Sequence, residues 1–365
     1  MYSFEPSDEQ KMLVEAVNRY ATNDLRPAAR DAEEEGNLPK KIVSKGWELG
    51  VLQASIPEAF SGFGDHSAVT GVLAAEEMAY GDLAGSLAVM TPGLYVIPIL
   101  MGGSDEQKKE HIPSVIEADW HPYTAALIEP TFDFDPNELM TIAKVEGGEY
   151  VLNGTKTLVP YAAEVEAMIV YANLDGKTQG FIVPKGSPGL KVGAEREKLM
   201  SLNSLPLFTI TLDKVHVPSV NRLGSEEGHD FAPILAAQRV ALAAMAVGVA
   251  KAAFEYARDY AKEREAFGMK IAQKQAIAFM LAEMATEIEA GRILNWEAAW
   301  MLDTGKEEAN KQAYFAVTGA IDMVMMVTDR AVQILGGHGY IREHPVEMWM
   351  RNGRGFAAFT GLAIV

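Results

Sequence analysis

Arg264-Glu-Ala-Phe-Gly268 is the stretch that decides the fold, read together with Lys274-Gln275 and Gln333-Ile-Leu-Gly-Gly337. It ends a helical pattern that begins after Pro233 and is rich in Ala and Val. That pattern places four charged residues on a face expected to be solvated: Lys251, Glu255, Arg258 and Lys262. Further helical patterns run near 275–302, 310–335 and 345–358. Four helices of this length, joined by short polar or glycine turns, predict a bundle.

Upstream of the bundle the sequence has the character of strands. Thr141-Ile-Ala-Lys-Val145 and Tyr150-Val-Leu152 flank Gly147-Gly148, which predicts a β-hairpin with a two-residue turn. Runs rich in Val, Ile, Phe and Thr follow, and we expect them to be strands separated by turns at Asp-Gly, Ser-Pro-Gly and Asp213-Lys214: these runs are 167–172, 180–183 and 207–217. A small β domain is therefore expected here.

The beginning of the chain has helical patterns. Ser7 and Gln10 form a predicted capping box, and apolar residues then recur every three to five positions at Leu13, Val17, Tyr20 and Leu25. The Ala- and Met-rich stretches 67–80 and 83–101 also have helical length. The predicted fold class is α+β, with three domains: an N-terminal α-helical domain (1–118), a middle β domain (119–222) and a C-terminal four-helix bundle (223–365).

Composition excludes several classes of function. The 50 acidic and 32 basic residues give a net charge of −18, which argues against a nucleic-acid partner. There is no cysteine, and His338 and His344 do not have metal-ligand spacing, so no metal site is predicted. No Rossmann or P-loop glycine motif is present. The start lacks the pattern of a signal peptide and no apolar run approaches the ~18 residues of a membrane span, so we expect a cytoplasmic protein without a membrane span.

The glycine and arginine motifs resemble those of the acyl-CoA dehydrogenase family, and the resemblance extends over nearly the whole chain. It implies an FAD cofactor, tetramers and electron-transfer flavoprotein as the oxidant. In that family the arginine at position 264 pairs with the FAD pyrophosphate of a neighbouring subunit, where a guanidinium matches phosphate oxygens. The other residues that the resemblance places at the cofactor are Phe267, Lys274, Gln275, Gln333, Gly336, Gly337 and Ile128. Taken singly, Arg264 is also compatible with a solvated helix end, and the glycines with helix C-caps.

A second part of the resemblance concerns the substrate, an acyl-CoA thioester. Val215-His-Val-Pro218 and Leu223-Gly224 resemble the family's exit from the β domain, and this alignment places Arg239 on the substrate side with Gln238 and Phe359. A buried arginine needs a partner. Two interpretations of Arg239 therefore stay open, a structural ion pair and a part of the acyl-CoA pocket.

The residues expected to remove a proton depart from the family pattern. α,β-Dehydrogenation takes a proton from Cα and passes a hydride from Cβ to flavin N5, so it needs a positioned base. In the run 351–361, Phe359 replaces the family's tyrosine and Thr360 replaces its catalytic glutamate, while Gln238 occupies an alternative seat of the base. Departures also occur at 128–135 and 158–160, and Leu362 and Ile364 replace polar residues. The catalytic residue is thus unknown from sequence.

Three hypotheses follow. The first is an acyl-CoA dehydrogenase-like oxidoreductase whose base is recruited from elsewhere, with Asp133 and Asp135 as the nearest candidates. The second is an acyl-CoA flavoprotein with a base-independent reaction of the desulfinase type. The third is a non-catalytic partner subunit in a mixed tetramer, where Arg264 and Gln333 complete a flavin site on another chain. We rank the first highest, because most chains of this architecture are active. The floor of the acyl pocket is expected in the N-terminal helices.

Overall fold

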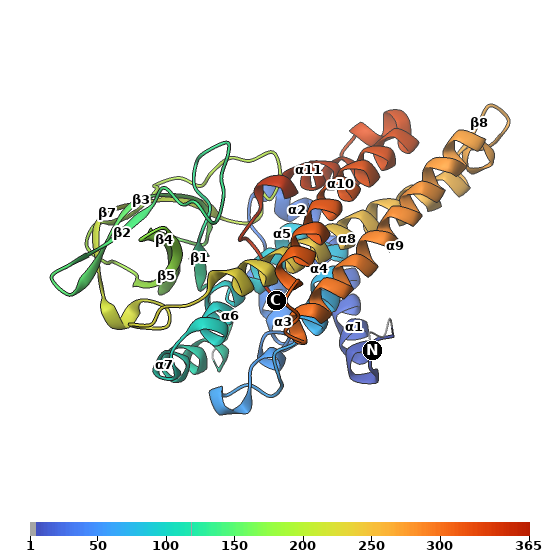
Figure 1. The fold of residues 1–365 in the computed structure, drawn as a ribbon. Coiled ribbons are helices and arrows are strands. Elements are labelled where there is room, and N and C mark those ends of the chain that lie inside the picture. Colours follow the sequence, from blue (N-terminus) through green and yellow to red (C-terminus); the bar gives the residue numbers. More distant parts are fainter. Residues whose placement is uncertain (1–4, 118) are drawn as a thin grey trace.

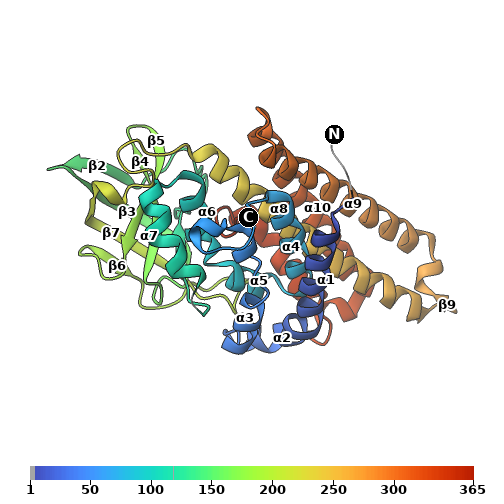
Figure 2. The ribbon, with the colours of Figure 1, turned by 90° about the horizontal axis from the view of Figure 1, so that it is seen from below.

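The computed structural model describes residues 5–117 and 119–365 and has the predicted α+β class (Figure 1). The β-sheet lies at one end of the molecule, and the long C-terminal helices extend from it to a small hairpin at the other end. The N-terminal helices pack along one side of these long helices (Figure 2).

The N-terminal region is helical as predicted. Its capping box is present, since the Ser7 side chain accepts from the Gln10 amide and the Gln10 side chain accepts from Ser7. A π-helix at 21–25 brings Leu25 onto the buried face. The stretch 83–101 is helical as expected and forms two helices, which Thr91-Pro92 separates. The helices are α1 (Asp8–Tyr20), α2 (Arg26–Glu35), α3 (Lys40–Trp47), α4 (Ala68–Gly81), α5 (Leu83–Met90), α6 (Gly93–Gly102) and α7 (Asp105–Ile116).

The middle region forms one seven-stranded mixed sheet in the order β1-β4-β2-β3-β7-β6, with β5 paired to β4. The glycine-turn hairpin is confirmed: Glu146 pairs with Glu149, and both intervening glycines have positive φ. The turn predicted at Asp213-Lys214 is wrong, because β7 continues through it with a bulge and Lys214 at φ 53°. The strands are β1 (Thr124–Ala126), β2 (Ile142–Glu146), β3 (Glu149–Pro160), β4 (Ala167–Leu174), β5 (Lys177–Pro184), β6 (Leu190–Val192) and β7 (Leu207–Pro218).

The C-terminal region is built on one central helix. Its helices are α8 (Phe231–Glu263), α9 (Gln275–Asp303), α10 (Ala309–Leu335) and α11 (Val346–Gly355), and a hairpin of β8 (Glu265–Ala266) and β9 (Met269–Lys270) joins the first two. Among the described residues, α8 is a single helix with the length and apolar composition needed to cross a membrane. Its most apolar window is 83% buried inside the protein, which is the behaviour of a bundle's core helix.

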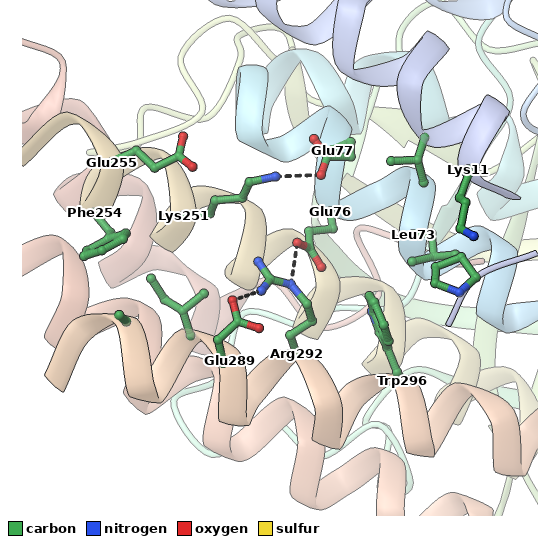
Figure 3. A pocket seen from close by; sticks show the side chains of 14 residues that line it. Lys11, Leu73, Glu76, Glu77, Lys251, Phe254, Glu255, Glu289, Arg292 and Trp296 are labelled. Atoms are coloured by element: carbon green, nitrogen blue, oxygen red, sulfur yellow. Dashed lines mark hydrogen bonds and ion pairs between the residues drawn. The ribbon is translucent and has the colours of Figure 1, made fainter. Parts of the chain in front are cut away.

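The charged residues of α8 form the predicted solvated face only in part: the Lys262 side chain is 63% exposed, whereas Lys251 and Glu255 pair with side chains of α4. Figure 3 shows Lys251 turned toward α4, where its Nζ lies 2.7 Å from a Glu77 carboxylate oxygen. Arg292 of α9 pairs with Glu76, also on α4, at 2.8 Å. Lys251 and Glu255 have these partners because α4 lies beside this part of α8. The periodicity of one helix does not reveal such a neighbour.

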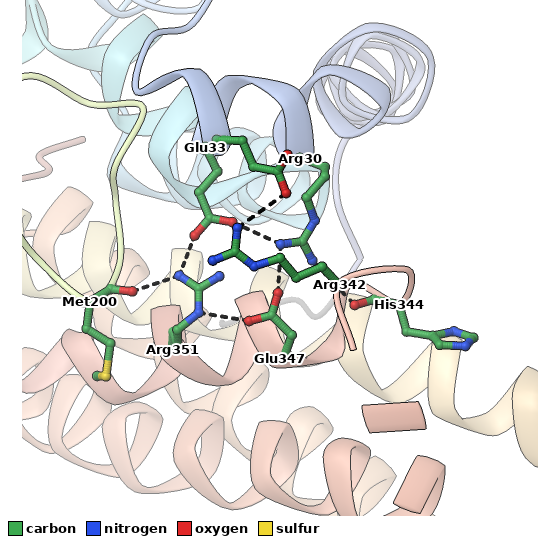
Figure 4. Close-up of polar contacts among 8 residues, drawn as sticks. Arg30, Glu33, Met200, Arg342, His344, Glu347 and Arg351 are labelled. Atoms are coloured by element: carbon green, nitrogen blue, oxygen red, sulfur yellow. Dashed lines mark hydrogen bonds and ion pairs between the residues drawn. The ribbon is translucent and has the colours of Figure 1, made fainter. Parts of the chain in front are cut away.

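A polar network joins all three regions of the chain (Figure 4). Arg351 of α11 donates to the Glu347 carboxylate at 2.9 Å, to the Met200 carbonyl of the β domain at 2.7 Å, and to Glu33 of α2. Arg30 of α2 forms an ion pair with Glu347 at 2.7 Å. The guanidinium of Arg351 therefore fixes α11, and the segment that follows it, against both other domains.

The segment after Thr360 turns into the core. Leu362, Ala363, Ile364 and Val365 are all buried, with Ile364 packed among the residues of α6. Val365 lies so close to Gly71 of α4 that a Cβ there would meet it at 2.5 Å. Burial explains why apolar side chains stand at positions 362 and 364. These side chains leave an empty cavity of only about 40 Å³ between the N-terminal helices.

Candidate functional site

Thr360 lies between two cavities and lines both. The first, of about 380 Å³, is bounded on the β-domain side by Ile128, Thr131 and Leu158. The second, of about 560 Å³, lies between the loop 133–137 and helices α8 and α10. The residue at the family's base position therefore stands where a cofactor and a substrate in adjacent cavities would meet.

A buried ion pair holds the wall of the first cavity. The Lys156 ammonium donates to the Glu129 carboxylate at 2.8 Å and to the Leu127 carbonyl at 3.0 Å. Glu129 also accepts from the backbone amides of Met140 and Thr141, at 2.6 and 2.7 Å. Burial lowers the pKa of Lys156 to about 8, with Glu129 opposing the shift. Burial also opposes ionisation of Glu129, but Lys156 and the hydrogen bonds outweigh it and lower its pKa. The pair fixes the backbone on both sides of Ile128.

The second cavity brings together most of the residues predicted for the substrate. Gln238, Arg239, Asp133 and Asp135 line it together with Thr360. Arg239 lies with its guanidinium 5.1 Å from the ring centroid of Tyr314, and burial lowers its pKa. It forms no ion pair with any residue that the structure describes, so the structural ion pair considered for Arg239 is absent from the described chain.

Two expectations about this cavity differ from the structure. Phe359 is buried against Phe356, with ring centroids 5.8 Å apart, and is not among the residues lining either cavity. Its predicted contact with substrate therefore gains no support. The cavity floor is formed by α8 and α10 instead of the expected N-terminal helices, because residues 362–365 occupy the space between those helices.

The predicted cofactor residues after α8 form a separate cluster. Arg264 and Gly337 line a cavity of about 320 Å³ with Tyr260 and His338. Phe267 at the hairpin tip is 91% exposed, and the Lys274 ammonium lies 5.1 Å from its ring centroid. Gln275 and Gln333 are exposed nearby on the same side of the bundle, at the start of α9 and near the end of α10.

This cluster is too far from Thr360 to serve the same cofactor. Gln238, which lines a cavity with Thr360, lies on α8, and Arg264 directly follows the end of that helix. The 26 residues between them span about 39 Å at the usual helical rise of ~1.5 Å per residue. That separation exceeds the length of an extended FAD molecule. The Arg264 cluster of one chain therefore does not reach the cavity that Gln238 and Thr360 line, and Arg264 itself is exposed.

The glycines of the outer cluster fit a ligand that lies outside this chain. A Cβ added at Gly336 or Gly337 would meet nothing within 4 Å. The positive φ of Gly336, 58°, explains a glycine there, but Gly337 has no such requirement. Together with the exposed guanidinium of Arg264, this open surface is suited to the close approach of a phosphate-bearing group. The residues present thus fit an FAD held across a subunit interface.

Comparison with known proteins identifies the family. Models of the N-terminal, middle and C-terminal domains of acyl-CoA dehydrogenase match residues 7–119, 124–215 and 231–363. An acyl-CoA dehydrogenase of Bacillus subtilis is 34% identical over 358 residues, which cover 95% of this chain and 93% of that protein. The chain belongs to the acyl-CoA dehydrogenase family. This family is FAD-dependent, so membership confirms the predicted oxidoreductase class and cofactor.

Two further acyl-CoA dehydrogenase relatives are close in sequence or structure. The caffeyl-CoA reductase-Etf complex subunit CarC of Acetobacterium woodii is 34% identical, covering 98% of this chain and 96% of the relative. The solved structure of butyryl-CoA dehydrogenase from Megasphaera elsdenii is similar with a TM-score of 0.89 at 30% identity, covering 99% of this chain and 96% of that one. The family fold thus extends over the whole chain.

Sequence reasoning missed two features of the outer cluster. The Nδ1 atom of His338 shares a hydrogen bond of 2.7 Å with the Tyr260 hydroxyl, and Nδ1 of His344 shares one of 2.7 Å with the Tyr256 hydroxyl. The two imidazole rings stack, with their centroids 5.4 Å apart. One signal for this contact is present in the sequence, because Tyr256 and Tyr260 are four residues apart and so lie on one face of a helix. The two histidines are therefore built into the bundle, and no group of three or more His, Asp or Glu that could hold a metal occurs among the described residues.

Proposed function

We propose that the chain catalyses α,β-dehydrogenation of an acyl-CoA thioester, with a carboxylate of the loop 133–137 as the base. The observation that supports this role is the lining of the larger cavity. Asp133 and Asp135 open onto the same space as Thr360, Gln238 and Arg239. Position 360, where the family has its base, is a threonine, and position 238, the alternative position of the base, is a glutamine. The carboxylates that line this cavity are those of Asp133 and Asp135, so they are the candidates for the base.

The roles of the residues follow from their chemistry. The carboxylate takes the Cα proton, and the Arg239 guanidinium provides positive charge at the cavity wall that favours the developing enolate. When bound beside Ile128, the flavin supplies the acceptor for the hydride from Cβ. The apolar side chains of Leu242, Val317 and Ile321 exclude water from the acyl group.

The two aspartates differ in their local contacts. Asp135 accepts hydrogen bonds from the Asn137 backbone amide and side-chain amide, at 2.8 and 3.0 Å. Asp133 has no hydrogen bond to another described residue and is exposed, so its carboxylate is free to turn toward a substrate. We therefore expect Asp133→Asn to slow flavin bleaching by saturated acyl-CoA at least tenfold, because Asp135 replaces it only in part.

Anaerobic stopped-flow absorbance measures this rate, and Asp213→Asn on β7 is the matched control outside the cavity. Equal rates in Asp133→Asn, Asp135→Asn and the wild type would contradict a base in this loop. A flavin-containing protein that binds acyl-CoA but does not bleach would instead favour the base-independent reaction of the desulfinase type.

A second function, completion of a flavin site on another subunit, is favoured by the position of Arg264. Its distance from the chain's own cavities and its exposure suit a partner's FAD pyrophosphate, which predicts a homotetramer or a mixed tetramer with a related chain. Exposed apolar side chains on α9 and α10 support such an assembly: Phe279, Ile293, Tyr314 and Phe315. If the partner supplies all of the chemistry, this chain is its non-catalytic subunit.

Arg264→Leu tests the shared site. Loss of a charge-assisted contact to phosphate is expected to weaken FAD binding about tenfold to a hundredfold, since such bonds contribute roughly 1.5–3 kcal/mol. The measurement is the flavin-to-protein ratio and the Kd from flavin titration of the purified assembly. Arg258→Leu is the matched control, because Arg258 lies on α8 but pairs with Asp259. Unchanged FAD affinity in Arg264→Leu would contradict a phosphate contact.

The oxidant and the compartment complete the proposal. The resemblance to a subunit of a caffeyl-CoA reductase-Etf complex supports electron-transfer flavoprotein as the partner that reoxidises the flavin. We also propose a cytoplasmic location, as the sequence predicts.

A further inference from the structure

Gln238 is a buried amide whose hydrogen bonds are missing. It is 1% exposed, and neither its Nε2 nor its Oε1 has a partner in the described ranges. The other two buried glutamines differ. Gln107 and Gln179 each have partners for both amide atoms, including the carbonyls of Val220 and His229. Because buried polar groups in folded proteins are nearly always paired, Gln238 points to a ligand that completes its bonding.

The surroundings of Gln238 provide room for such a ligand. It lines the cavity of about 560 Å³ beside Thr360 and Arg239, which has no ion pair with a described residue. Leu242, Val317 and Ile321 give the cavity apolar surface, and Asp133, Asp135 and Asn137 line it as well. A cavity whose polar groups stand at fixed positions beside apolar surface can fix the orientation of a small molecule.

The two free atoms of the amide select the chemistry of that ligand. Nε2 needs an acceptor and Oε1 needs a donor. A hydroxyl group satisfies both, because it accepts one hydrogen bond and donates another. A thioester carbonyl or a carboxylate only accepts and leaves Oε1 unpaired, and a methylene leaves both atoms unpaired.

We propose that the cavity binds an acyl group carrying a hydroxyl substituent, which the Gln238 amide recognises by one donated and one accepted hydrogen bond. This inference rests on the proposed function, since it takes the ligand to be an acyl-CoA thioester. It adds the class of acyl group, which neither the arginine and glycine motifs nor the family assignment specifies.

The test compares the Kd values of butyryl-CoA, α-hydroxybutyryl-CoA and β-hydroxybutyryl-CoA for the flavin-loaded assembly, measured by calorimetry. The wild type is expected to bind one hydroxylated thioester at least about tenfold more tightly than butyryl-CoA. Gln238→Met, which keeps the size and removes the amide, is expected to abolish that preference. Gln312→Met is the matched control, because Gln312 of α10 lies outside the cavity and donates to Glu297, and it should retain the preference.

Thermal unfolding gives a second readout for the same variants. Gln238→Met should fold and have a higher Tm than the wild type, because the substitution removes an unpaired buried amide. A lower Tm would show that the amide already has partners and would overturn the proposal. So would equal affinities of the wild type for all three thioesters, or a hydroxyl preference that persists in Gln238→Met. If no CoA thioester binds at all, the proposed function fails together with this inference.

Discussion

In a chain that also carries Asp133→Asn and Asp135→Asn, Thr360→Glu is expected to accelerate bleaching of the flavin by saturated acyl-CoA about a hundredfold or more. Thr360 lines the cofactor cavity and the substrate cavity, so a carboxylate there would stand where the family places its base. A positioned general base contributes roughly 10²–10⁴-fold to rate, whereas a threonine hydroxyl does not accept a proton at neutral pH. Single-turnover stopped-flow absorbance under nitrogen measures the rate of bleaching.

Thr360→Gln is the control for this gain, because glutamine has the shape of glutamate without its basicity. Bleaching that is equally slow in Thr360→Glu and Thr360→Gln would mean that position 360 is not the base seat in this chain. A gain seen with Thr360→Glu but not with Thr360→Gln would show that the cavity around position 360 can support dehydrogenation once a base is present.

The second large effect is on stability. Lys156→Met is expected to lower the free energy of unfolding by about 3–5 kcal/mol, the usual consequence of leaving one member of a buried ion pair without its partner. Glu129 would keep the backbone amides of Met140 and Thr141 but lose its counter-ion. Urea denaturation followed by circular dichroism measures the change.

The double variant Lys156→Met, Glu129→Gln separates the charge from the packing. Glu129→Gln removes the second charge and keeps one oxygen that can accept from one of the two backbone amides, so it should restore part of the lost stability. A cost below about 1 kcal/mol for the single variant would indicate that water reaches the pair, and that it does not fix the wall of the cofactor cavity.

Local signals in the sequence predicted local structure well. The Ser7 capping box, the glycine-turn hairpin and the long helical patterns depend on contacts between residues close in the chain, and all are present. The errors arose where tertiary contacts decide. A strand continues through Asp213-Lys214 because β3 pairs with both sides of the bulge, and Lys251 and Glu255 of α8 are paired because α4 lies beside them.

The site was predictable in part for a related reason. Motif resemblance located Arg239 and Gln238 beside Thr360, and the choice of Asp133 and Asp135 rested on their nearness in sequence to the cofactor segment. Which residues lack partners was not predictable, because an unpaired amide at Gln238 is defined by everything packed around it. The burial of Phe359 and of residues 362–365 likewise depends on the path of the chain after α11.

The most direct test of the account is the visible spectrum of the purified chain before and after anaerobic addition of saturated acyl-CoAs of several lengths. We predict a yellow protein, with FAD bound across the interface of its own assembly, that bleaches on addition of a thioester. A colourless protein that acquires flavin when a related chain is present, or a yellow protein that binds thioesters and stays yellow, would contradict dehydrogenation by this chain.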